Sequence, residues 1–320
     1  MIPRLFFAHL PTPIEEMPHL SDELKGPKLF IKRDDQTGLA FGGNKTRKLE
    51  FLLAEALAQG AETLISAGAI QSNHCRQVAA AAAKFGLNCI LVLFGQPPKA
   101  AEGNYLLDQL FGAKIVSTTR EQRDTKLQSV FEEAQAAGSQ AYLIPYGGSN
   151  ATGALAYAFA FDEMLSQDLS PDWVVLASSS GGTQAGMVLG AKRAQFKGNI
   201  LGISVDRPAE QLKSLVAKLA EETSIRLGDK INFSPADILV NSDYTGAGYG
   251  IMDRPEKEAI HLFARKEGLL LDPVYTGRAA AGLIDLIHKG FFKPEEKVLF
   301  WHTGGTPALF TKQYSKFLAN

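Results

Sequence analysis

Residues 173–186 read Trp-Val-Val-Leu-Ala-Ser-Ser-Ser-Gly-Gly-Thr-Gln-Ala-Gly, and this stretch decides the fold class. Its first part, Trp173–Ala177, is an apolar run of strand length, and a helical pattern follows Thr183. In the loop between them, glycines let backbone N–H groups approach an anion, and the helix N-terminus adds positive potential. The stretch therefore predicts a strand-loop-helix unit with a phosphate-binding loop, although a flexible turn that caps the helix would show the same pattern.

The alternation of strands and helices continues on both sides of this unit. Apolar residues at helical spacing predict an amphipathic helix over Thr46–Gln59 that ends at Gly60. Each predicted strand before it and after it is separated from the next by a helical stretch, which is typical of βαβ units with parallel strands. The fold class is therefore α/β with a mainly parallel sheet. The other predicted strands are Lys28–Lys32, Thr63–Ser66, Asn88–Phe94, Lys114–Ser117, Ala141–Ile144 and Lys297–Phe300.

The length and the charge balance restrict the class of protein. At 320 residues the chain is long enough for two α/β lobes. Length and rhythm predict a larger domain of residues 1–45 and 156–320, with a smaller α/β domain of residues 46–155 inserted between its two segments. The 33 basic and 34 acidic residues leave a formal charge of -1. Nucleic acid and anionic membrane surfaces both select a basic excess, so we expect neither as the main partner.

Cysteine content and apolar runs favour a reducing, cytoplasmic location. Cys75 and Cys89 cannot make a disulfide framework, and no cluster of Cys and His has the spacing of a zinc site, so no metal is expected. The apolar stretch Leu5–Ala8 is soon followed by prolines, so we expect no signal peptide. The longer apolar runs are well short of the roughly 20 residues that span a bilayer. We therefore expect no membrane insertion.

A second glycine cluster, Gly38–Thr46, contains a lysine at a predicted helix start. It differs from a P-loop because Asn44 separates the glycine from Lys45 and no apolar strand precedes it, which disfavours nucleotide hydrolysis. An amine at a helix N-terminus has its charged form disfavoured and can attack an aldehyde. The alternative is a surface lysine on an exposed helix, since Arg47 and Lys48 follow closely. Taken alone, the cluster favours the surface lysine.

Two further clusters, Ser66–His74 and Trp301–Pro307, also lie near helix starts. Ser72, Asn73 and His74 offer a hydroxyl, an amide and an imidazole where a carboxylate could bind, although Ser72 or Asn73 could simply cap the helix. Three of the four clusters follow the carboxyl end of a predicted strand, where open α/β sheets bind ligands. The pattern therefore predicts a ligand site built from several loops.

Five motifs, in the same order and spread over nearly the whole chain, resemble one family. They resemble the 1-aminocyclopropane-1-carboxylate (ACC) deaminases and D-cysteine desulfhydrases, which are pyridoxal-phosphate enzymes with the tryptophan synthase β-like fold, fold type II. The resemblance implies two open, twisted, mainly parallel sheets flanked by helices, with the cofactor bound mainly by the larger domain. It favours a nucleophilic Lys45 over a surface lysine. The motifs are Gly42–Glu50, Gln71–His74, Ser180–Gly186, Asp272–Gly277 and His302–Gly305.

The resemblance also implies which residues bind the cofactor, pyridoxal 5'-phosphate. Lys45 would bind it covalently and later take part in proton transfer at the substrate Cα. Asn73 would hold its 3'-oxygen, and Thr303 would face its pyridine nitrogen. The phosphate would be bound by Lys48, Ser180, Gly181, Gly182 and Thr183.

A second set of residues would face a small amino-acid substrate. Ser72, Asn73 and His74 match residues that lie beside the substrate, with Ser72 as a carboxylate contact or a proton carrier. Tyr249 and Tyr275 match a pair of tyrosines that approaches the substrate amine and the leaving group. Which residue adds or removes the Cα proton is left open. The family also implies a homodimer.

Two threonines favour β-elimination as the reaction. Where the pyridine nitrogen faces a hydroxyl such as that of Thr303, no acid holds it protonated, and electrons at Cα should promptly expel a β-substituent. ACC deaminases carry a glutamate directly after the tyrosine of the Asp-Pro-Val-Tyr motif, whereas this chain has Thr276. The resemblance therefore favours a lyase that converts D-cysteine, or a close β-substituted amino acid, to pyruvate, ammonia and sulfide.

Other activities share these motifs. An L-cysteate sulfo-lyase and an ACC deaminase remain alternatives, and a β-replacement enzyme of the cysteine synthase type is a more distant one. The motifs do not encode the chirality of the substrate, because chirality depends on which face of the bound substrate meets the base.

Overall fold

The computed structural model describes residues 2–319, and seven of its ten strands lie where the sequence predicts them. Every predicted strand is present, and its ends differ from the predicted ends by at most three residues. Three strands, β1, β8 and β9, were not predicted. The strands are β1 (Ile14–Glu16), β2 (Lys28–Arg33), β3 (Thr63–Ala69), β4 (Asn88–Phe94), β5 (Lys114–Thr118), β6 (Ala141–Leu143), β7 (Trp173–Ser178), β8 (Asn199–Ser204), β9 (Leu239–Asn241) and β10 (Lys297–His302).

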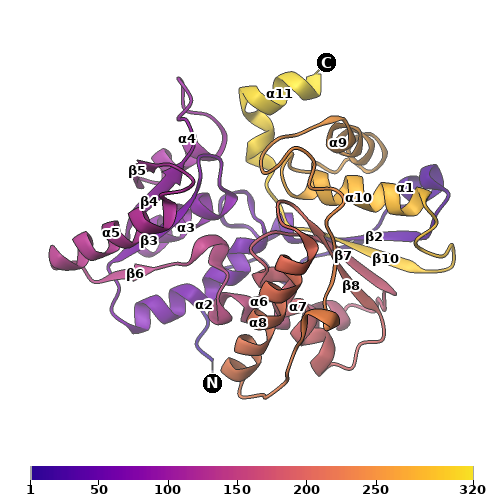
Figure 1. The fold of residues 1–320 in the computed structure, drawn as a ribbon, viewed down its shortest axis with the longest axis horizontal. Coiled ribbons are helices and arrows are strands. Elements are labelled where there is room, and N and C mark those ends of the chain that lie inside the picture. Colours follow the sequence, from indigo (N-terminus) through magenta and orange to yellow (C-terminus); the bar gives the residue numbers. More distant parts are fainter. Residues whose placement is uncertain (1, 320) are drawn as a thin grey trace.

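The strands form two sheets, as Figure 1 shows. The larger has six strands in the order β1-β2-β10-β7-β8-β9, and the smaller has four in the order β5-β4-β3-β6. Neighbouring strands run parallel except for β1, which pairs antiparallel with β2. The predicted fold class, α/β with two mainly parallel sheets, is confirmed.

Helices connect the strands and cover the sheets. The predicted helix at residues 46–59 is present as α2, which begins two residues earlier. None of the described helices is both long and apolar enough to cross a bilayer. The helices are α1 (Pro18–Leu24), α2 (Asn44–Ala58), α3 (Asn73–Phe85), α4 (Gly103–Leu110), α5 (Arg123–Ala136), α6 (Ala151–Leu165), α7 (Gly182–Arg193), α8 (Ala209–Leu227), α9 (Arg254–Glu267), α10 (Thr276–His288) and α11 (Lys312–Ala319).

The segment that forms the smaller sheet lies in the sequence between two segments that form the larger sheet. Strands β1 and β2 belong to the six-stranded sheet, β3 to β6 form the four-stranded sheet, and β7 to β10 complete the first. The predicted domain boundaries, at residues 45–46 and 155–156, fall inside α2 and α6. Since no break in the helices marks them, these boundaries stay a prediction.

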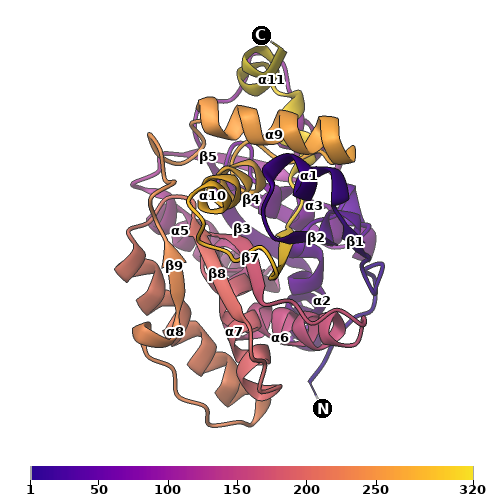
Figure 2. The same cartoon turned by 90° about the vertical axis from the view of Figure 1, so that its right-hand side faces the viewer.

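Side chains alternate between two cores on the faces of the larger sheet. Along β10, Val298 and Phe300 pack into the core under α1, α9 and α10, whereas Leu299 and Trp301 pack into the core under α6 and α7. This is the two-residue period of a strand that is buried on both faces. Figure 2 shows the two groups of helices on opposite sides of the larger sheet. The smaller sheet is covered by α2 and α3 on one face and by α5 on the other.

Helix α2 is largely buried. The prediction of an exposed helix, which rested on its basic residues, is therefore wrong. Arg47 is 2% exposed and Lys48 is 1% exposed. The helix packs against α6 on one side and α3 on the other. Its cationic side chains therefore bind partners from distant parts of the chain, and the local sequence gives no sign of these partners.

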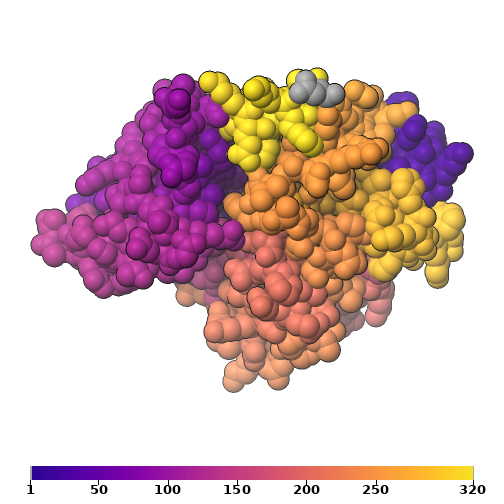
Figure 3. Space-filling view, turned by 45° about the horizontal axis from the view of Figure 1, so that its top comes forward, coloured from indigo at the N-terminus to yellow at the C-terminus, as the bar shows by residue number. Residues whose placement is uncertain are grey.

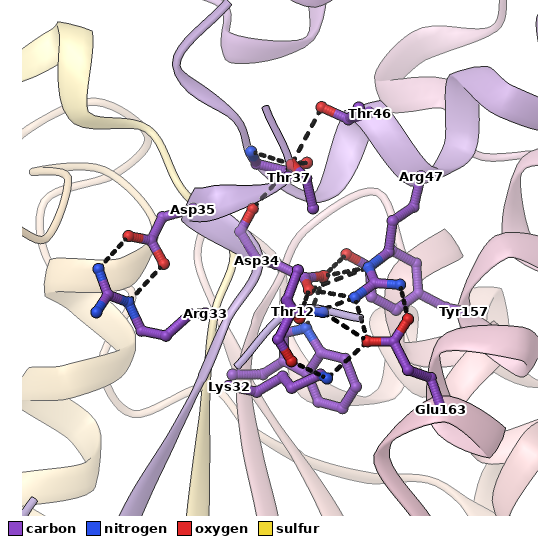
Figure 4. Close-up of polar contacts among 12 residues, drawn as sticks. Thr12, Lys32, Arg33, Asp34, Asp35, Thr37, Thr46, Arg47, Tyr157 and Glu163 are labelled. Carbon is purple, nitrogen blue, oxygen red and sulfur yellow. Dashed lines mark hydrogen bonds and ion pairs between the residues drawn. The ribbon is translucent and has the colours of Figure 1, made fainter. Parts of the chain in front are cut away.

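The strongest of these partnerships is a buried cluster of two acids and two bases, drawn in Figure 4. Arg47 in α2 donates to both carboxylate oxygens of Asp34, at 2.8–3.0 Å, and to Glu163 of α6 at 2.8 and 2.9 Å. Lys32 of β2 donates to Glu163 at 2.7 Å. Burial alone would raise the pKa of Asp34, but the Arg47 guanidinium outweighs burial and lowers it. Asp34 also accepts hydrogen bonds from Thr12, Tyr157 and Trp301.

Removal of Arg47 should be strongly destabilising. We expect Arg47→Ala to lower the free energy of unfolding by about 3–5 kcal/mol, because Asp34 and Glu163 would stay buried without their guanidinium partner. Urea denaturation followed by circular dichroism measures the loss. Arg33→Ala is the matched control: Arg33 pairs with Asp35 at a partly exposed position, and its removal should cost less than about 1 kcal/mol. Equal losses for the two variants would contradict the prediction.

Candidate active site

One cavity is lined by residues from loops of both sheets. It is built from the loops that follow the carboxyl ends of β3, β6, β7 and β10 and from the first turns of α2, α3, α7 and α10. In Figure 3 the surface is hollowed where the segment of the smaller sheet, in purple, meets the second half of the chain, in orange and yellow. The predicted site residues that line the cavity are Lys45, Ser72, Asn73, His74, Ser180, Gly181, Thr183, Tyr275 and Thr303.

Lys45 lies in the first turn of α2 with its amine in the cavity. Its Nζ donates to the carbonyl oxygen of Gly147 at 3.0 Å. Burial lowers the pKa of Lys45 to about 8. A substantial fraction of this amine is therefore neutral near pH 8, and a neutral amine can attack an aldehyde.

Lys48 lies one turn further along α2, behind the cavity wall. Its Nζ donates to the same Gly147 carbonyl at 3.3 Å and to Ser149 Oγ at 3.2 Å. Burial, followed by the charge of Lys45, lowers the pKa of Lys48 well below its ordinary value. The two amines therefore compete for one acceptor, and a bound anion would relieve this competition.

We did not identify from the sequence the loop after β6, whose Gly147 carbonyl accepts hydrogen bonds from both lysine amines. Tyr146 and Gly147 line the cavity, and the Arg123 guanidinium lies 4.4 Å from the centre of the Tyr146 ring. Ser149 Oγ is 2.7 Å from Ser180 Oγ in the glycine loop after β7. The available signal was the sequence Pro-Tyr-Gly-Gly-Ser-Asn at residues 145–150, which follows a predicted strand as the other glycine clusters do.

The loops after β6 and β7 lie too close together for side chains at Gly147 and Gly182. A Cβ on Gly182 would lie 2.7 Å from Ser149 Oγ, and a Cβ on Gly147 would lie 2.6 Å from Ser180 Oγ. Gly181 has a φ of +77°, in the left-handed region that favours glycine. Gly181 and Thr183, at the start of α7, line the cavity, and the N–H groups of a helix start are suited to bind a phosphate.

The start of α3 places three polar side chains in the cavity wall. Ser72 caps the helix, since its Oγ accepts a hydrogen bond from the Cys75 N–H at 3.1 Å. His74 is 4% exposed, and its Nε2 lies 3.0 Å from Ser66 Oγ. Burial, and then the charges of Lys45 and Lys48, lower the pKa of His74 well below its ordinary value. The imidazole is therefore neutral at pH 7.

Two tyrosines meet at the far side of the cavity. Tyr275 lines it, and Tyr249 lies behind Tyr275 with the two hydroxyl oxygens 2.7 Å apart. Burial raises the pKa of each tyrosine well above its ordinary value. Both hydroxyls are therefore protonated at pH 7, and the pair can donate a hydrogen bond into the cavity.

Asp272 accepts a hydrogen bond from the Tyr275 backbone and another from the Thr276 hydroxyl. The Asp272 carboxylate accepts backbone hydrogen bonds from Val274, Tyr275 and Thr276. Thr276 Oγ1 donates to Asp272 Oδ1 at 2.8 Å and accepts from the Asp272 N–H at 2.7 Å. Both hydrogen bonds of the Thr276 hydroxyl are therefore to Asp272, and Thr276 is not among the described residues that line the cavity.

The loop after β10 brings Thr303 into the wall by close contact with the start of α2. The Thr303 carbonyl accepts a hydrogen bond from the Asn44 N–H at 3.0 Å. A Cβ on Gly304 would lie 2.7 Å from the Gly43 Cα. Asn44 Nδ2 also donates to Thr183 Oγ1 at 3.0 Å. Asn44 therefore ties together the three loops that carry Lys45, Thr303 and the candidate phosphate site.

The arrangement fits pyridoxal 5'-phosphate, the cofactor that the resemblance implies. A buried amine with a lowered pKa suits its aldehyde, and a glycine-lined helix start suits its phosphate. Asn73 and Thr303 line the wall between these two features. Three predicted site residues do not line the cavity directly: Lys48, Gly182 and Tyr249 each lie one contact behind it. The individual roles stay predictions.

Comparisons with known proteins agree with this chemistry. Residues 5–304 match the family described as pyridoxal-phosphate dependent enzyme. A solved ACC deaminase homologue is 38% identical, with a TM-score of 0.90, and the alignment covers 99% of this chain and 96% of that one. An L-serine ammonia-lyase from Rhizomucor miehei aligns with a TM-score of 0.70 at 15% identity, over 98% and 97% of the two chains.

A third solved structure, threonine deaminase isoform 2 from Solanum lycopersicum, aligns with a TM-score of 0.66 at 18% identity, over 97% of this chain and 82% of that one. At these low identities the two ammonia-releasing enzymes show a shared fold only. The family match spans most of the chain and includes every loop of the cavity. The chain therefore belongs to the pyridoxal-phosphate dependent enzyme family, and pyridoxal 5'-phosphate is its cofactor.

Proposed function

We propose that the protein is a carbon-sulfur lyase that eliminates sulfide from D-cysteine or a close β-substituted amino acid. The overall reaction consumes one water and yields pyruvate, ammonia and hydrogen sulfide. The proposal is supported by the matching motifs and by the similarity to an ACC deaminase homologue. Bound pyridoxal 5'-phosphate supplies an electron sink that makes the substrate Cα–H acidic. The protein residues orient the substrate and move its protons.

One observation favours elimination over ring opening. Among the described residues that line the cavity, none is aspartate or glutamate. Asp272, in the same motif as Tyr275, is engaged by the N–H groups at the start of α10 and by the Thr276 hydroxyl. A pyridine nitrogen bound beside Thr303 would therefore meet a hydroxyl and no carboxylate, so that electrons at Cα are better used to expel a leaving group.

Lys45 and Ser72 are the best candidates for proton transfer at Cα. The Lys45 amine projects into the cavity and has a lowered pKa of about 8, so it can accept a proton near neutral pH. Ser72 Oγ lines the same cavity at the start of α3, where helix N–H groups also favour a substrate carboxylate. Ser72 can therefore hold the carboxylate or pass the proton on.

The tyrosine pair suits the departure of a thiol. Tyr275 lines the cavity with a protonated hydroxyl, which lies 2.7 Å from the Tyr249 hydroxyl. A hydroxyl that donates to the departing sulfur stabilises the negative charge that develops there. Because the pKa of both tyrosines is raised, the donor stays protonated across the neutral pH range.

Lys45→Ala should abolish cofactor attachment and catalysis. We expect the visible absorption band of the purified protein to disappear and pyruvate release to fall by at least about a thousandfold, because Lys45 carries the only amine among the described residues that line the cavity. Absorbance spectroscopy and a coupled pyruvate assay measure the two effects. Lys84→Ala, at an exposed position near the end of α3, is the control and should keep both signals. A Lys45→Ala protein with a normal visible band would exclude this role.

The lowered pKa of Lys45 should set the pH dependence of cofactor capture. In protein stripped of cofactor, only the neutral amine attacks the aldehyde, so the rate constant for capture should rise about tenfold per pH unit up to about pH 8 and then level off. An unperturbed lysine would keep rising to about pH 10. Rapid mixing with pyridoxal 5'-phosphate at pH 6 to 10 measures the profile. A plateau reached only near pH 10 would contradict the burial effect.

A substrate panel tests the proposed reaction itself. Pyruvate should form from D-cysteine and β-chloro-D-alanine, with sulfide as the second product from D-cysteine. L-Cysteine and L-cysteate test chirality and the leaving group, and 2-oxobutyrate formation tests ACC as a substrate. Cysteine formation from O-acetylserine and sulfide would indicate β-replacement. If ACC alone reacts, the inference from Thr276 and Thr303 is wrong.

A further inference from the structure

The amide of Asn73 is held in one orientation by two donors. Asn73 lines the cavity at the start of α3, and its Oδ1 accepts hydrogen bonds from Arg76 Nη1 at 3.1 Å and from Asn104 Nδ2 at 2.8 Å. Rotating the amide by 180° would place its NH₂ group against both donors. The contacts therefore determine which end of the amide is the oxygen.

The other end of the amide is left as an unused donor. Asn73 Nδ2 lies beside the loop after β10, 2.8 Å from where a Cβ on Gly305 would be. Within residues 2–319, no group accepts a hydrogen bond from it. A donor that is fixed in a cavity wall and lacks a protein partner is available to an oxygen of a bound molecule.

Arg76 connects this amide to the loop that precedes Lys45. Besides Asn73, the Arg76 guanidinium donates to Asn104 Oδ1 at 2.8 Å and to the Gly42 carbonyl at 2.9 Å. Gly42 lies three residues before Lys45, so one side chain contacts both the start of α3 and the approach to α2. Asn104 is itself fixed, because its Nδ2 also donates to the Gln71 carbonyl at 2.9 Å.

Stability alone does not account for this arrangement. Arg76, Asn104 and Asp108 are each 0% exposed. Neither carboxylate oxygen of Asp108 has a hydrogen-bond partner among the described residues, although its charge acts on Arg76. Burial lowers the pKa of Arg76 to about 10 and raises the pKa of Asp108 to about 8. A buried guanidinium of this kind is costly compared with an apolar side chain of similar size, so a role in the neighbouring cavity is a better explanation.

We propose that Arg76 and Asn104 are positioning residues that fix the amide of Asn73 so that its Nδ2 donates to the 3'-oxygen of bound pyridoxal 5'-phosphate. Neither residue lines the cavity, so both act through Asn73. The inference rests on the cofactor of the family and not on the choice of substrate. The positioning role can therefore be disproved without affecting the proposed lyase activity. It can also be correct if the enzyme acts on another substrate.

A double-mutant cycle on cofactor binding tests the proposal. The dissociation constant of pyridoxal 5'-phosphate is measured by equilibrium dialysis for the wild type, Asn73→Ala, Asn104→Ala and the double variant. We expect each single variant to bind the cofactor about tenfold more weakly, the effect of one lost hydrogen bond to a charged acceptor. In the Asn73→Ala background, Asn104→Ala should change the dissociation constant by less than about twofold, since its effect passes through Asn73.

The visible spectrum of the bound cofactor provides a second readout that a general loss of stability would not move. At saturating cofactor, Asn104→Ala should shift the absorption maximum in the same direction as Asn73→Ala, because the 3'-oxygen lies beside the reactive aldehyde carbon. Thr63→Val is the matched control. Thr63 is 4% exposed and loses a buried hydrogen bond to Ser139 at the opposite end of β3. It should lower the thermal midpoint but leave affinity and spectrum unchanged.

Arg76→Lys extends the test if Asn104→Ala does not fold. It keeps a positive charge near Asp108 but cannot contact Asn73, Asn104 and Gly42 at once. It should also weaken cofactor binding about tenfold, and it should add little in the Asn73→Ala background. Equal losses of affinity in both backgrounds, or a wild-type spectrum and affinity for both Asn104→Ala and Arg76→Lys, would overturn the proposal.

Discussion

The buried pairing of Arg47 with Asp34 and Glu163 determines where α2 lies, and the rest of the site depends on that helix. From the first turns of α2, Arg47 reaches Asp34, directly after β2, and Glu163 in α6. Lys45 is two residues upstream and Lys48 one residue downstream. Because the anchored helix is surrounded by protein, both amines are removed from water, and their pKa values fall. An ion cluster outside the cavity thus anchors the helix that carries the reactive amine, and burial of that amine lowers its pKa.

Helix starts from both sheets converge on this anchored helix. Asn44 binds the Thr303 carbonyl and the Thr183 hydroxyl, so the loops after β10 and β7 are held against the start of α2. The contact between Gly43 and Gly304 is too close for any other residue. Chemistry on a bound amino acid requires groups placed to within a fraction of an ångström, and short backbone contacts of this kind provide such placement.

Much of the fold was predictable because its signals are local. Apolar runs and helical spacing located α2 and seven of the ten described strands. We missed β8 and also β1 and β9, which have three residues each and so carry little periodic pattern. The basic cluster after Asn44 suggested an exposed helix, and this was wrong, because the partner of Arg47 is 13 residues away in Asp34 and 116 residues away in Glu163. Tyr146 and Gly147 were missed since their loop meets the lysines only in the folded chain.

The sequence by itself determined the strand-loop-helix units, the glycines at the carboxyl ends of the strands and the amine at the start of α2, because each depends on residues that are neighbours in the chain. Tertiary structure alone decided which loops share a cavity, how far the pKa of Lys45 falls and which end of the Asn73 amide faces inward. Desolvation and amide orientation depend on atoms from distant segments, and only packing of the two sheets brings Arg76, Asn104 and Gly147 to these positions.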